Sequence, residues 1–213
     1  MTTAEAGEIS GSDYPVRLAV LRPATQSRLT NFPLGIGMLI RSILAIPHLI
    51  IIYFLQIVAN IIYFIACFAI LFTGRYPRGL FNFYVGYLRW NAAMSGYLVS
   101  AYDNYPPFSM ETQPEYPLTL SIDYPENLNR ILNLPIFIGY FIKFVLLIPH
   151  YIVLAFLIFA AMVVLFIAQF AILFTGSFPA GMHGFMIGVG RWFTRVSAYN
   201  AAITDRYPPF SLN

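Results

Sequence analysis

The chain has 213 residues, of which 59% are hydrophobic and only 10% are charged. A soluble domain contains about 45–50% apolar and about 25% charged residues, so this composition excludes an ordinary soluble protein and predicts one whose apolar surface meets lipid. The net charge is +3 without any run of lysine or arginine, and the single cysteine and three histidines lack metal-ligand spacing, which excludes nucleic acid as a partner and a structural metal site.

The first segment, residues 1–13, is small, polar and acidic. It lacks the basic start and the apolar stretch of a secretory signal peptide. We therefore expect a disordered polar tail.

Two tandem repeats follow this tail. Residues 14–109 align without a gap with residues 116–211, and 42 of the 96 pairs are identical. Such self-similarity indicates an internal duplication, with one repeat over 14–109, a linker over 110–115 and a second repeat over 116–213. Because both repeats keep the same loop sequences, we expect both to sit the same way up in the membrane, as parallel rather than inverted repeats.

Each repeat opens with a short alternation of apolar and polar residues, at 16–20 and 118–122. A period of two with β-branched residues predicts a strand, and the flanking prolines limit it to about seven residues. Since a lone strand is unstable, we expect the two strands to pair with each other or with a partner chain.

An amphipathic helix is predicted next, over about residues 27–46 and 126–148. Basic and polar residues recur in it three or four positions apart, including Arg41 and its counterpart Lys143. We expect this helix to lie in the headgroup plane with both cations on lipid phosphates. The alternative is a full crossing in which Arg41 reaches outward to the interface.

A long uncharged segment follows in each repeat, at residues 48–72 and 150–174. The preceding Pro47 and Pro149 interrupt helical hydrogen bonding, so we expect an elbow from the interface into the bilayer. As a helix, each segment of 25 residues is about 37 Å long, enough to cross the ~30 Å hydrocarbon core. The sequence therefore predicts an integral membrane protein.

The last predicted helix covers about residues 79–102 and 181–204. Small residues four positions apart let helices approach closely in lipid, so we interpret it as a packing helix that crosses beside the long one. These small residues are Ala92, Gly96, Ser100, Thr194, Ala198 and Ala202. Each repeat then ends in Tyr-Pro-Pro-Phe-Ser, an extended exit segment.

The strings FAILFTGRYPRG and YPPFSL, with an Arg-Trp pair between them, resemble a bacterial membrane family known as domain of unknown function 4389. The resemblance covers both repeats and implies two tandem copies of that domain. The second copy has Ser177 and Ala180 where the first has Arg75 and Arg78, so the loop arginines are not shared. Because the family carries no known activity, the resemblance implies an architecture rather than a function.

Two histidines, His48 and His150, hold matching positions after the prolines. One hypothesis is a haem or quinone clamp, in which both imidazoles act on one cofactor. The interpretation that we favour is a histidine at the membrane interface that bonds free carbonyls or lipid headgroups. On this interpretation the sequence predicts no cofactor.

Two arginines, Arg89 and Arg191, lie in the middle of the packing helices and must face protein or water. They could form a site for an anion or a lipid phosphate, or tie neighbouring helices together; we favour the tie. On the long helix, Gln56 and Asn60 are expected to bond a neighbouring helix. No hydrolytic arrangement of residues is evident, so the sequence predicts that the protein is not an enzyme.

The expected function is that of a structural or accessory subunit in a homo-oligomer or a larger membrane assembly. The alternatives are a small transporter, channel or lipid-handling protein with its site at the repeat interface, and a haem- or quinone-binding redox subunit. We expect a multi-pass protein of the cytoplasmic (inner) membrane. Arg17, Arg22 and Arg28 favour a cytoplasmic N-terminus, although Arg75 and Arg78 oppose it.

Overall fold

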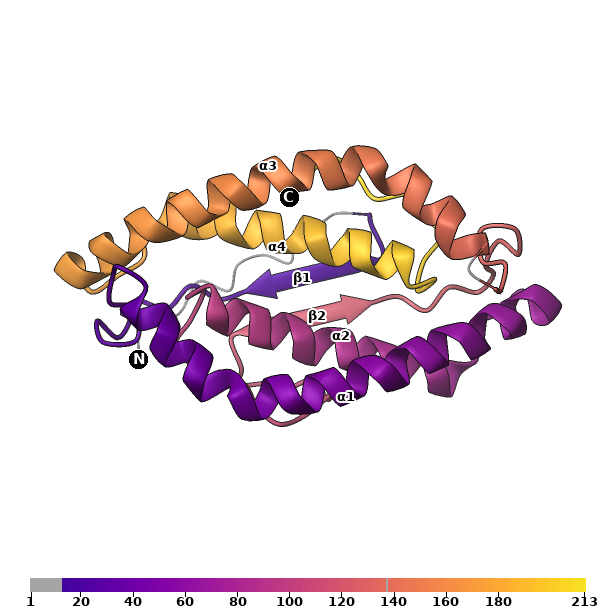
Figure 1. Ribbon diagram of the computed structural model, residues 1–213, viewed down its shortest axis with the longest axis horizontal. Coiled ribbons are helices and arrows are strands. Elements are labelled where there is room, and N and C mark those ends of the chain that lie inside the picture. Colours follow the sequence, from indigo (N-terminus) through magenta and orange to yellow (C-terminus); the bar gives the residue numbers. More distant parts are fainter. Residues whose placement is uncertain (1–12, 137) are drawn as a thin grey trace.

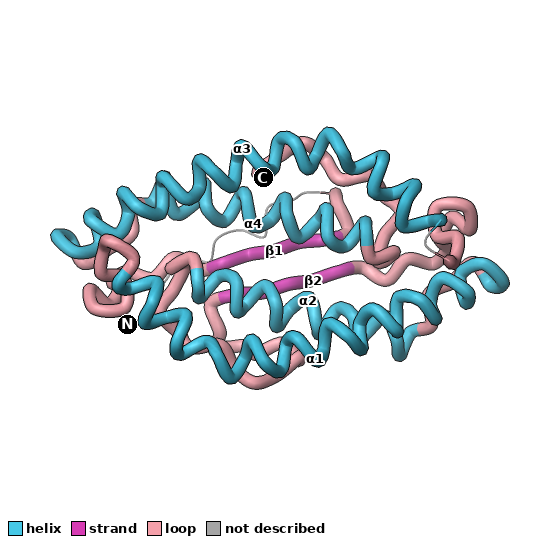
Figure 2. Tube along the Cα trace, in the orientation of Figure 1, coloured by secondary structure: helices cyan, strands magenta, loops and turns pink. Residues whose placement is uncertain are grey.

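The structure is a computed structural model that describes residues 13–136 and 138–213. Four helices and one two-stranded sheet make up the described chain (Figure 2). The elements, in chain order, are β1 (Val16–Val20), α1 (Ile36–Thr73), α2 (Arg78–Leu98), β2 (Leu118–Ile122), α3 (Ile138–Thr175) and α4 (Ala180–Asn200). The mostly helical architecture with short strands is confirmed, and of the predicted polar tail all but Asp13 lies outside the described residues.

The two strands pair with each other about a pseudo-two-fold axis. They are antiparallel, with Leu18 opposite Leu120. These two leucines occupy equivalent positions in the two repeats, so the axis passes between them. The two repeats are thus confirmed, and because a half-turn relates them, their equivalent elements run in opposite directions, as α1 and α3 show in Figure 1.

The molecule has three layers, and the repeats exchange strands between them. α1 packs on α2 and α3 packs on α4, while β1 packs on α4 and β2 packs on α2. The α2 and α4 helices therefore lie between the sheet and the long helices, which form the outer edges of the molecule in Figure 1. Because each strand covers a helix of the other repeat, neither repeat completes its core alone.

Each long helix uses a narrow seam for packing and exposes the rest. The buried seam residues recur every seven positions: Ala45, Ile52, Ala59 and Ala66 on α1, and Leu147, Leu154, Ala161 and Ala168 on α3. Both helices are long and apolar enough to cross a membrane, and only 22% of the most apolar stretch of each is buried. This burial is much lower than that of a core helix in a soluble protein, which is mostly buried.

The predicted elbow is wrong, because α1 continues through Pro47 and α3 through Pro149. Among residues 13–136, which the structure describes, no separate interfacial helix precedes the long helix of either repeat. An internal proline removes one hydrogen bond and bends a helix without ending it. Both long helices are bent, so that the N-terminal part of each leans toward the other repeat and the molecule has the outline of a lens (Figure 1).

The long helices also begin later than predicted, at Ile36 and Ile138 rather than near residues 27 and 126. In the first repeat, Leu34 and Gly35 both have positive φ angles, of 62° and 81°, which a helix does not allow. The Gly37 N–H donates back to the Phe32 carbonyl at 2.9 Å, closing a turn. This turn sets the direction in which the first residues of the helix point.

Candidate functional site

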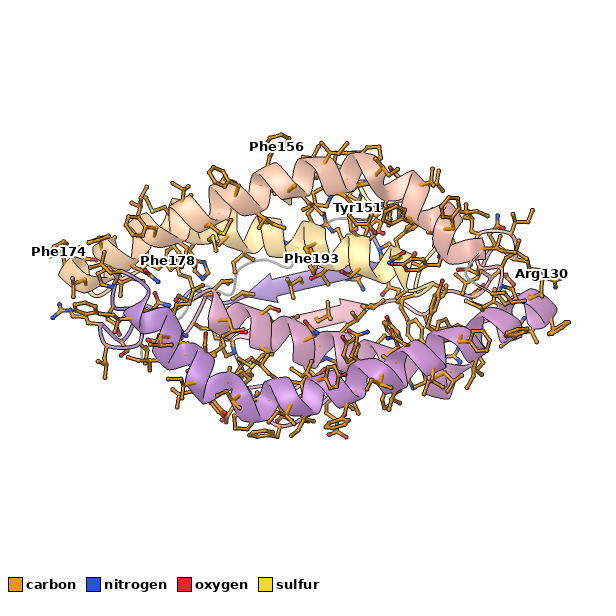
Figure 3. All side chains as sticks on the ribbon, viewed as in Figure 1. Arg130, Tyr151, Phe156, Phe174, Phe178 and Phe193 are labelled. Carbon is orange, nitrogen blue, oxygen red and sulfur yellow. The ribbon has the colours of Figure 1, made fainter. Side chains whose placement is uncertain are left out.

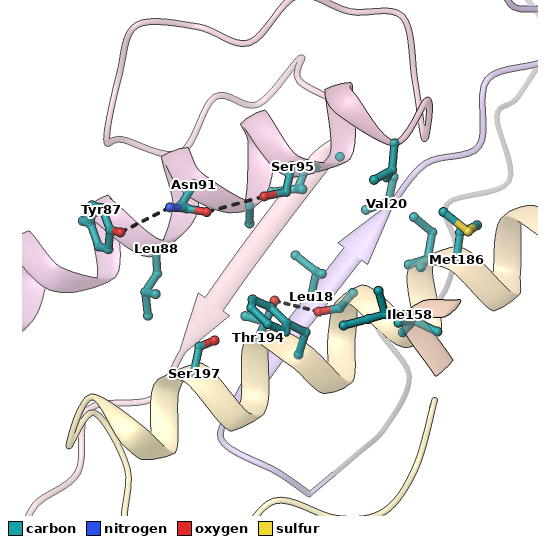
Figure 4. Close-up of a pocket in the computed structure, with 18 of the residues that line it drawn as sticks. Leu18, Val20, Tyr87, Leu88, Asn91, Ser95, Ile158, Met186, Thr194 and Ser197 are labelled. Atoms are coloured by element: carbon teal, nitrogen blue, oxygen red, sulfur yellow. Dashed lines mark hydrogen bonds between the residues drawn. The ribbon is translucent and has the colours of Figure 1, made fainter. Parts of the chain in front are cut away.

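A pocket of about 610 Å³ lies on the pseudo-two-fold axis between α2 and α4 (Figure 4). Leu18, Val20 and Leu118, from the inner face of the sheet, form its floor. Residues of α1 and α3 flank it, and among the described residues these two helices do not contact each other. The pocket therefore lies between the two repeats, with one long helix on either side.

One wall of the pocket carries a chain of hydrogen bonds, here called the polar ladder. The Ser95 hydroxyl donates to Asn91 Oδ1 at 3.4 Å, and Asn91 Nδ2 donates to the Tyr87 hydroxyl at 3.2 Å. That hydroxyl donates to Gln56 Oε1, and Gln56 Nε2 donates to Asn60 Oδ1 at 3.0 Å. The expected bond from α1 to a neighbouring helix is thus confirmed at Gln56.

The facing wall, from the second repeat, is mostly apolar. Ile158, Met162, Val189 and Phe193 stand where the first repeat has Gln56, Asn60, Tyr87 and Asn91, and all eight residues line the pocket. None of the described residues that line the pocket is charged. The pocket therefore has one wall that can form hydrogen bonds with a ligand and one apolar wall.

The sequence analysis missed this pocket. The signal was present in the four-residue spacing of Tyr87, Asn91 and Ser95, which places all three on one face of a helix. It could not be interpreted without knowing that the strand pairing brings α2 and α4 to the same axis.

Each predicted histidine lies in an aromatic cluster of its own repeat. His48 is fully buried; its Nδ1 accepts a hydrogen bond from the Trp90 indole at 3.0 Å, and its ring stacks on Phe108 at 3.7 Å. His150 repeats this arrangement with Trp192 at 2.9 Å and Phe210 at 3.9 Å. The exit segments supply the stacked phenylalanines.

The tryptophan fixes the chemistry of each histidine. An indole only donates, so Nδ1 must carry the lone pair and Nε2 the hydrogen. Nε2 of His48 and of His150 is buried without a hydrogen-bond partner in the described structure. Metal ligation would use a lone pair that this nitrogen does not have in this tautomer, and the two rings lie on long helices that do not contact each other. The structure does not bring them together around one cofactor.

Arg41 lies at the centre of a buried polar cluster rather than on a lipid phosphate. Its side chain is fully buried and forms an ion pair with Asp103. It also donates to the carbonyls of Tyr97 at 2.7 Å and Tyr102 at 2.9 Å, and to Asn31 Oδ1 at 2.9 Å. The expectation of a headgroup contact at Arg41 is therefore wrong, because the turn before α1 points this residue inward.

Lys143 repeats this cluster in the second repeat. Its buried ammonium donates to Asn133 Oδ1 at 2.7 Å and to the Tyr199 carbonyl at 2.9 Å, and it pairs with Asp205 at 3.2 Å. The expected phosphate contact at Lys143 is wrong for the same reason. Across the described residues, no group of three or more His, Cys, Asp or Glu is arranged to hold a metal ion.

Arg89 and Arg191 tie the helices to the exchanged strands. Arg89 donates to the carbonyls of Met110 at 2.6 Å and Leu120 at 3.4 Å. Arg191 donates to Leu18 at 3.0 Å and Leu212 at 2.8 Å. Each arginine thus binds a strand carbonyl of the other repeat and the carbonyl of the residue that directly follows the exit segment of its own. These bonds join a helix to a strand and a chain segment, and not to a neighbouring helix as expected.

The predicted small residues pack mainly inside the molecule. A Cβ at Gly96 would lie 2.5 Å from the Tyr102 hydroxyl, so this glycine makes room for a ring of its own repeat. Ser100 and Ala202 have φ angles of 61° and 58° and lie beyond the ends of α2 and α4. They are therefore turn residues rather than helix residues. The other three behave as helix residues: Ala198 is fully buried, Thr194 is nearly so, and Ala92 lines the pocket.

Comparison with known proteins returns one family. A model described as a domain of unknown function (DUF4389) matches residues 36–110 and residues 138–211. Each match spans one long helix, the following middle-layer helix and the exit segment, which confirms the two tandem copies; the exchanged strands precede the matched segments. No curated protein and no solved structure matches the chain.

Proposed function

Since the chain belongs to the DUF4389 family and carries two tandem copies of its domain, we propose that it is a non-enzymatic membrane protein that binds a neutral amphiphile between those copies. The ligand has an apolar chain and an uncharged hydroxyl, ester or carbonyl group. This function corresponds to the lipid-handling alternative of the sequence analysis. We place the protein in the cytoplasmic (inner) membrane.

The single observation that carries this proposal is the pairing of the polar ladder with an apolar wall. A pocket of about 610 Å³ falls in the usual range of about 300–1,000 Å³ for small-molecule sites. A charged ligand would lose its hydration there without meeting an opposite charge, which costs several kcal/mol. A ligand without polar groups would gain nothing from Gln56, Asn60 and Asn91.

Filling the pocket tests the proposal. A Cβ at Gly190 meets open space, and Gly190 lines the pocket, so Gly190→Leu places a side chain in the cavity without a backbone clash. We expect the amount of lipid or other amphiphile that co-purifies per chain, measured by mass spectrometry of an organic extract, to fall about tenfold, corresponding to about 1.4 kcal/mol. Gly184→Leu is the matched control, because Gly184 also meets open space on α4 but does not line the pocket.

A second variant takes its residues from the chain itself. Gln56→Ile with Asn60→Met gives the first repeat the residues of the second, removing part of the polar ladder while keeping an apolar wall. We expect the co-purified polar amphiphile to be lost or replaced by less polar species. Unchanged ligand content in both this variant and Gly190→Leu would contradict the proposal.

A second candidate function is the accessory subunit that the sequence analysis favoured. The observation that supports it is the exposed apolar surface of the long helices; Phe156 and Phe174 point away from the body of the molecule (Figure 3) and are 73% and 76% exposed. This surface must be covered by lipid or by protein. Particle mass in lipid nanodiscs separates the two, since a partner-free single chain there would count against the accessory role.

A further inference from the structure

The molecule has two unlike faces on opposite sides of its middle layer. The long-helix face consists of α1 and α3, which carry no charged residue from 42 to 73 or from 144 to 175. The sheet face consists of the outward strand residues, among them Arg17, Thr119 and Ser121, with Asp123 just beyond the end of β2. The pseudo-two-fold axis runs through both faces.

The sheet face places a charged pair close to that axis. Arg17 is the residue directly before Leu18, and the axis passes between Leu18 and Leu120. The Arg17 Cα therefore lies only about 3.4 Å along the strand from the position of the axis. It pairs with Asp123, and the two side chains are 28% and 56% exposed. Hydrogen bonding from Arg17 lowers the pKa of Asp123, so the pair stays charged at neutral pH.

A crossing orientation conflicts with this pair. If α1 and α3 crossed the bilayer, the long dimension of the molecule would lie near the membrane normal and the pseudo-two-fold axis would lie near the midplane. The exposed Arg17 and Asp123 would then face hydrocarbon, where charged side chains are strongly disfavoured. A helix of 38 residues is also about 57 Å long, well beyond the ~30 Å core.

The two ends of the molecule are joined by matching backbone hydrogen bonds. The Leu128 N–H donates to the Gly74 carbonyl at one end, and the Gln26 N–H donates to the Gly176 carbonyl at the other, both at 2.8 Å. The exposed Arg130 lies beside Gly74, and the exposed Arg28 lies beside Gly176. At each end an arginine beside the loop can therefore contact a headgroup phosphate, although the loop arginines Arg75 and Arg78 occur at only one of the two ends.

We propose that the long-helix face is embedded in a single leaflet, with α1 and α3 parallel to the bilayer plane, the pseudo-two-fold axis along the membrane normal and the sheet face in water. Arg28 and Arg130, at the two ends of the molecule, then contact headgroup phosphates. The exposed aromatic residues of the exit segments, such as Tyr105 and Tyr207, lie at the depth of the membrane interface. Both repeats sit the same way up without any crossing. The pocket opens toward the acyl chains of that leaflet.

Cysteine labelling tests the orientation. In a Cys67→Ala background, Arg78→Cys and Ala180→Cys place thiols at equivalent exposed positions at opposite ends of the molecule, and Thr119→Cys places one on the sheet face. We expect a membrane-impermeant maleimide to label all three from the same side when spheroplasts and inverted membrane vesicles are compared. Labelling of Arg78→Cys and Ala180→Cys from opposite sides, with Thr119→Cys unreactive from both, would overturn the proposal.

A measurement on the unaltered protein keeps the test independent of these variants. The four helices run broadly along the long dimension of the molecule (Figure 1). In aligned bilayers of phosphatidylethanolamine and phosphatidylglycerol, polarised infrared spectroscopy reports the mean angle of helical amide groups to the membrane normal. We expect the helical amide groups to lie, on average, close to the bilayer plane. A mean orientation close to the membrane normal would overturn the proposal. Neither result depends on whether the pocket holds a ligand.

Discussion

Replacing Arg41 with methionine is expected to lower the free energy of unfolding by about 3–5 kcal/mol. The methionine fills much of the same space, so the loss reports on charge and hydrogen bonding rather than on volume. It leaves Asp103 without its ion-pair partner and removes the donor from Asn31, Tyr97 and Tyr102. Removing one member of a buried ion pair costs more than the pair itself contributes, because the other charge, here the 28% exposed Asp103, stays partly desolvated. Chemical unfolding in detergent micelles, followed by circular dichroism, measures the loss.

The chain supplies its own control for this variant. Arg41→Lys copies the second repeat, where Lys143 pairs with an equivalent aspartate and asparagine, so we expect most of the stability to remain. Arg75→Met, at an exposed loop position, should change stability by no more than about 0.5 kcal/mol. An exposed ion pair contributes no more than about 1 kcal/mol to the free energy of unfolding. If Arg41→Met lowered that free energy by less than this amount, the cluster would be hydrated rather than buried.

Replacing Trp90 with alanine is expected to cost about 3–5 kcal/mol, the range for deleting a large buried aromatic side chain. Trp90 is 7% exposed and joins His48 and Phe108 in one aromatic cluster. The same unfolding measurement applies, and Trp192→Ala in the equivalent cluster should give a similar loss.

The conservative variant separates volume from hydrogen bonding. Trp90→Phe keeps most of the apolar contact but leaves His48 Nδ1 buried and unbonded, which costs about 1–3 kcal/mol. Tyr53→Phe, at an exposed position on α1, serves as the control. If Trp90→Phe were as stable as the unaltered protein, the indole would not determine the tautomer of His48.

Local sequence predicted the elements well but not their limits. The period-two alternation at residues 16–20 and 118–122 gave both strands, and the uncharged stretches gave the bodies of both long helices. The elbow at Pro47 failed because proline weakens a helix only locally, and packing of Ala45 and Ile52 against α2 sustains the helix through it. Ser100 and Ala202 were placed on helices because nothing in their residue type signals a left-handed turn.

For the candidate sites, too, the sequence predicted some features and not others. The sequence identified Arg41, Lys143, His48 and His150 as candidate binding residues, but it assigned the two cations to lipid phosphates and the two histidines to the membrane interface. It could not supply the partners, because Asp103 lies 62 positions from Arg41 and Trp90 lies 42 positions from His48. The pocket was beyond reach for the same reason, as its lining comes from both repeats.

The sequence by itself determined the duplication, the type of each main element and the apolar character of α1 and α3, because these depend on residues close together in the chain. Only the tertiary structure decided how the copies are joined. The pairing of Leu18 with Leu120 relates the two copies by a half-turn about the pseudo-two-fold axis. It also exchanges the strands between the copies and leaves a pocket on that axis. Such long-range pairing is set by the packing of the whole chain, which no local pattern records.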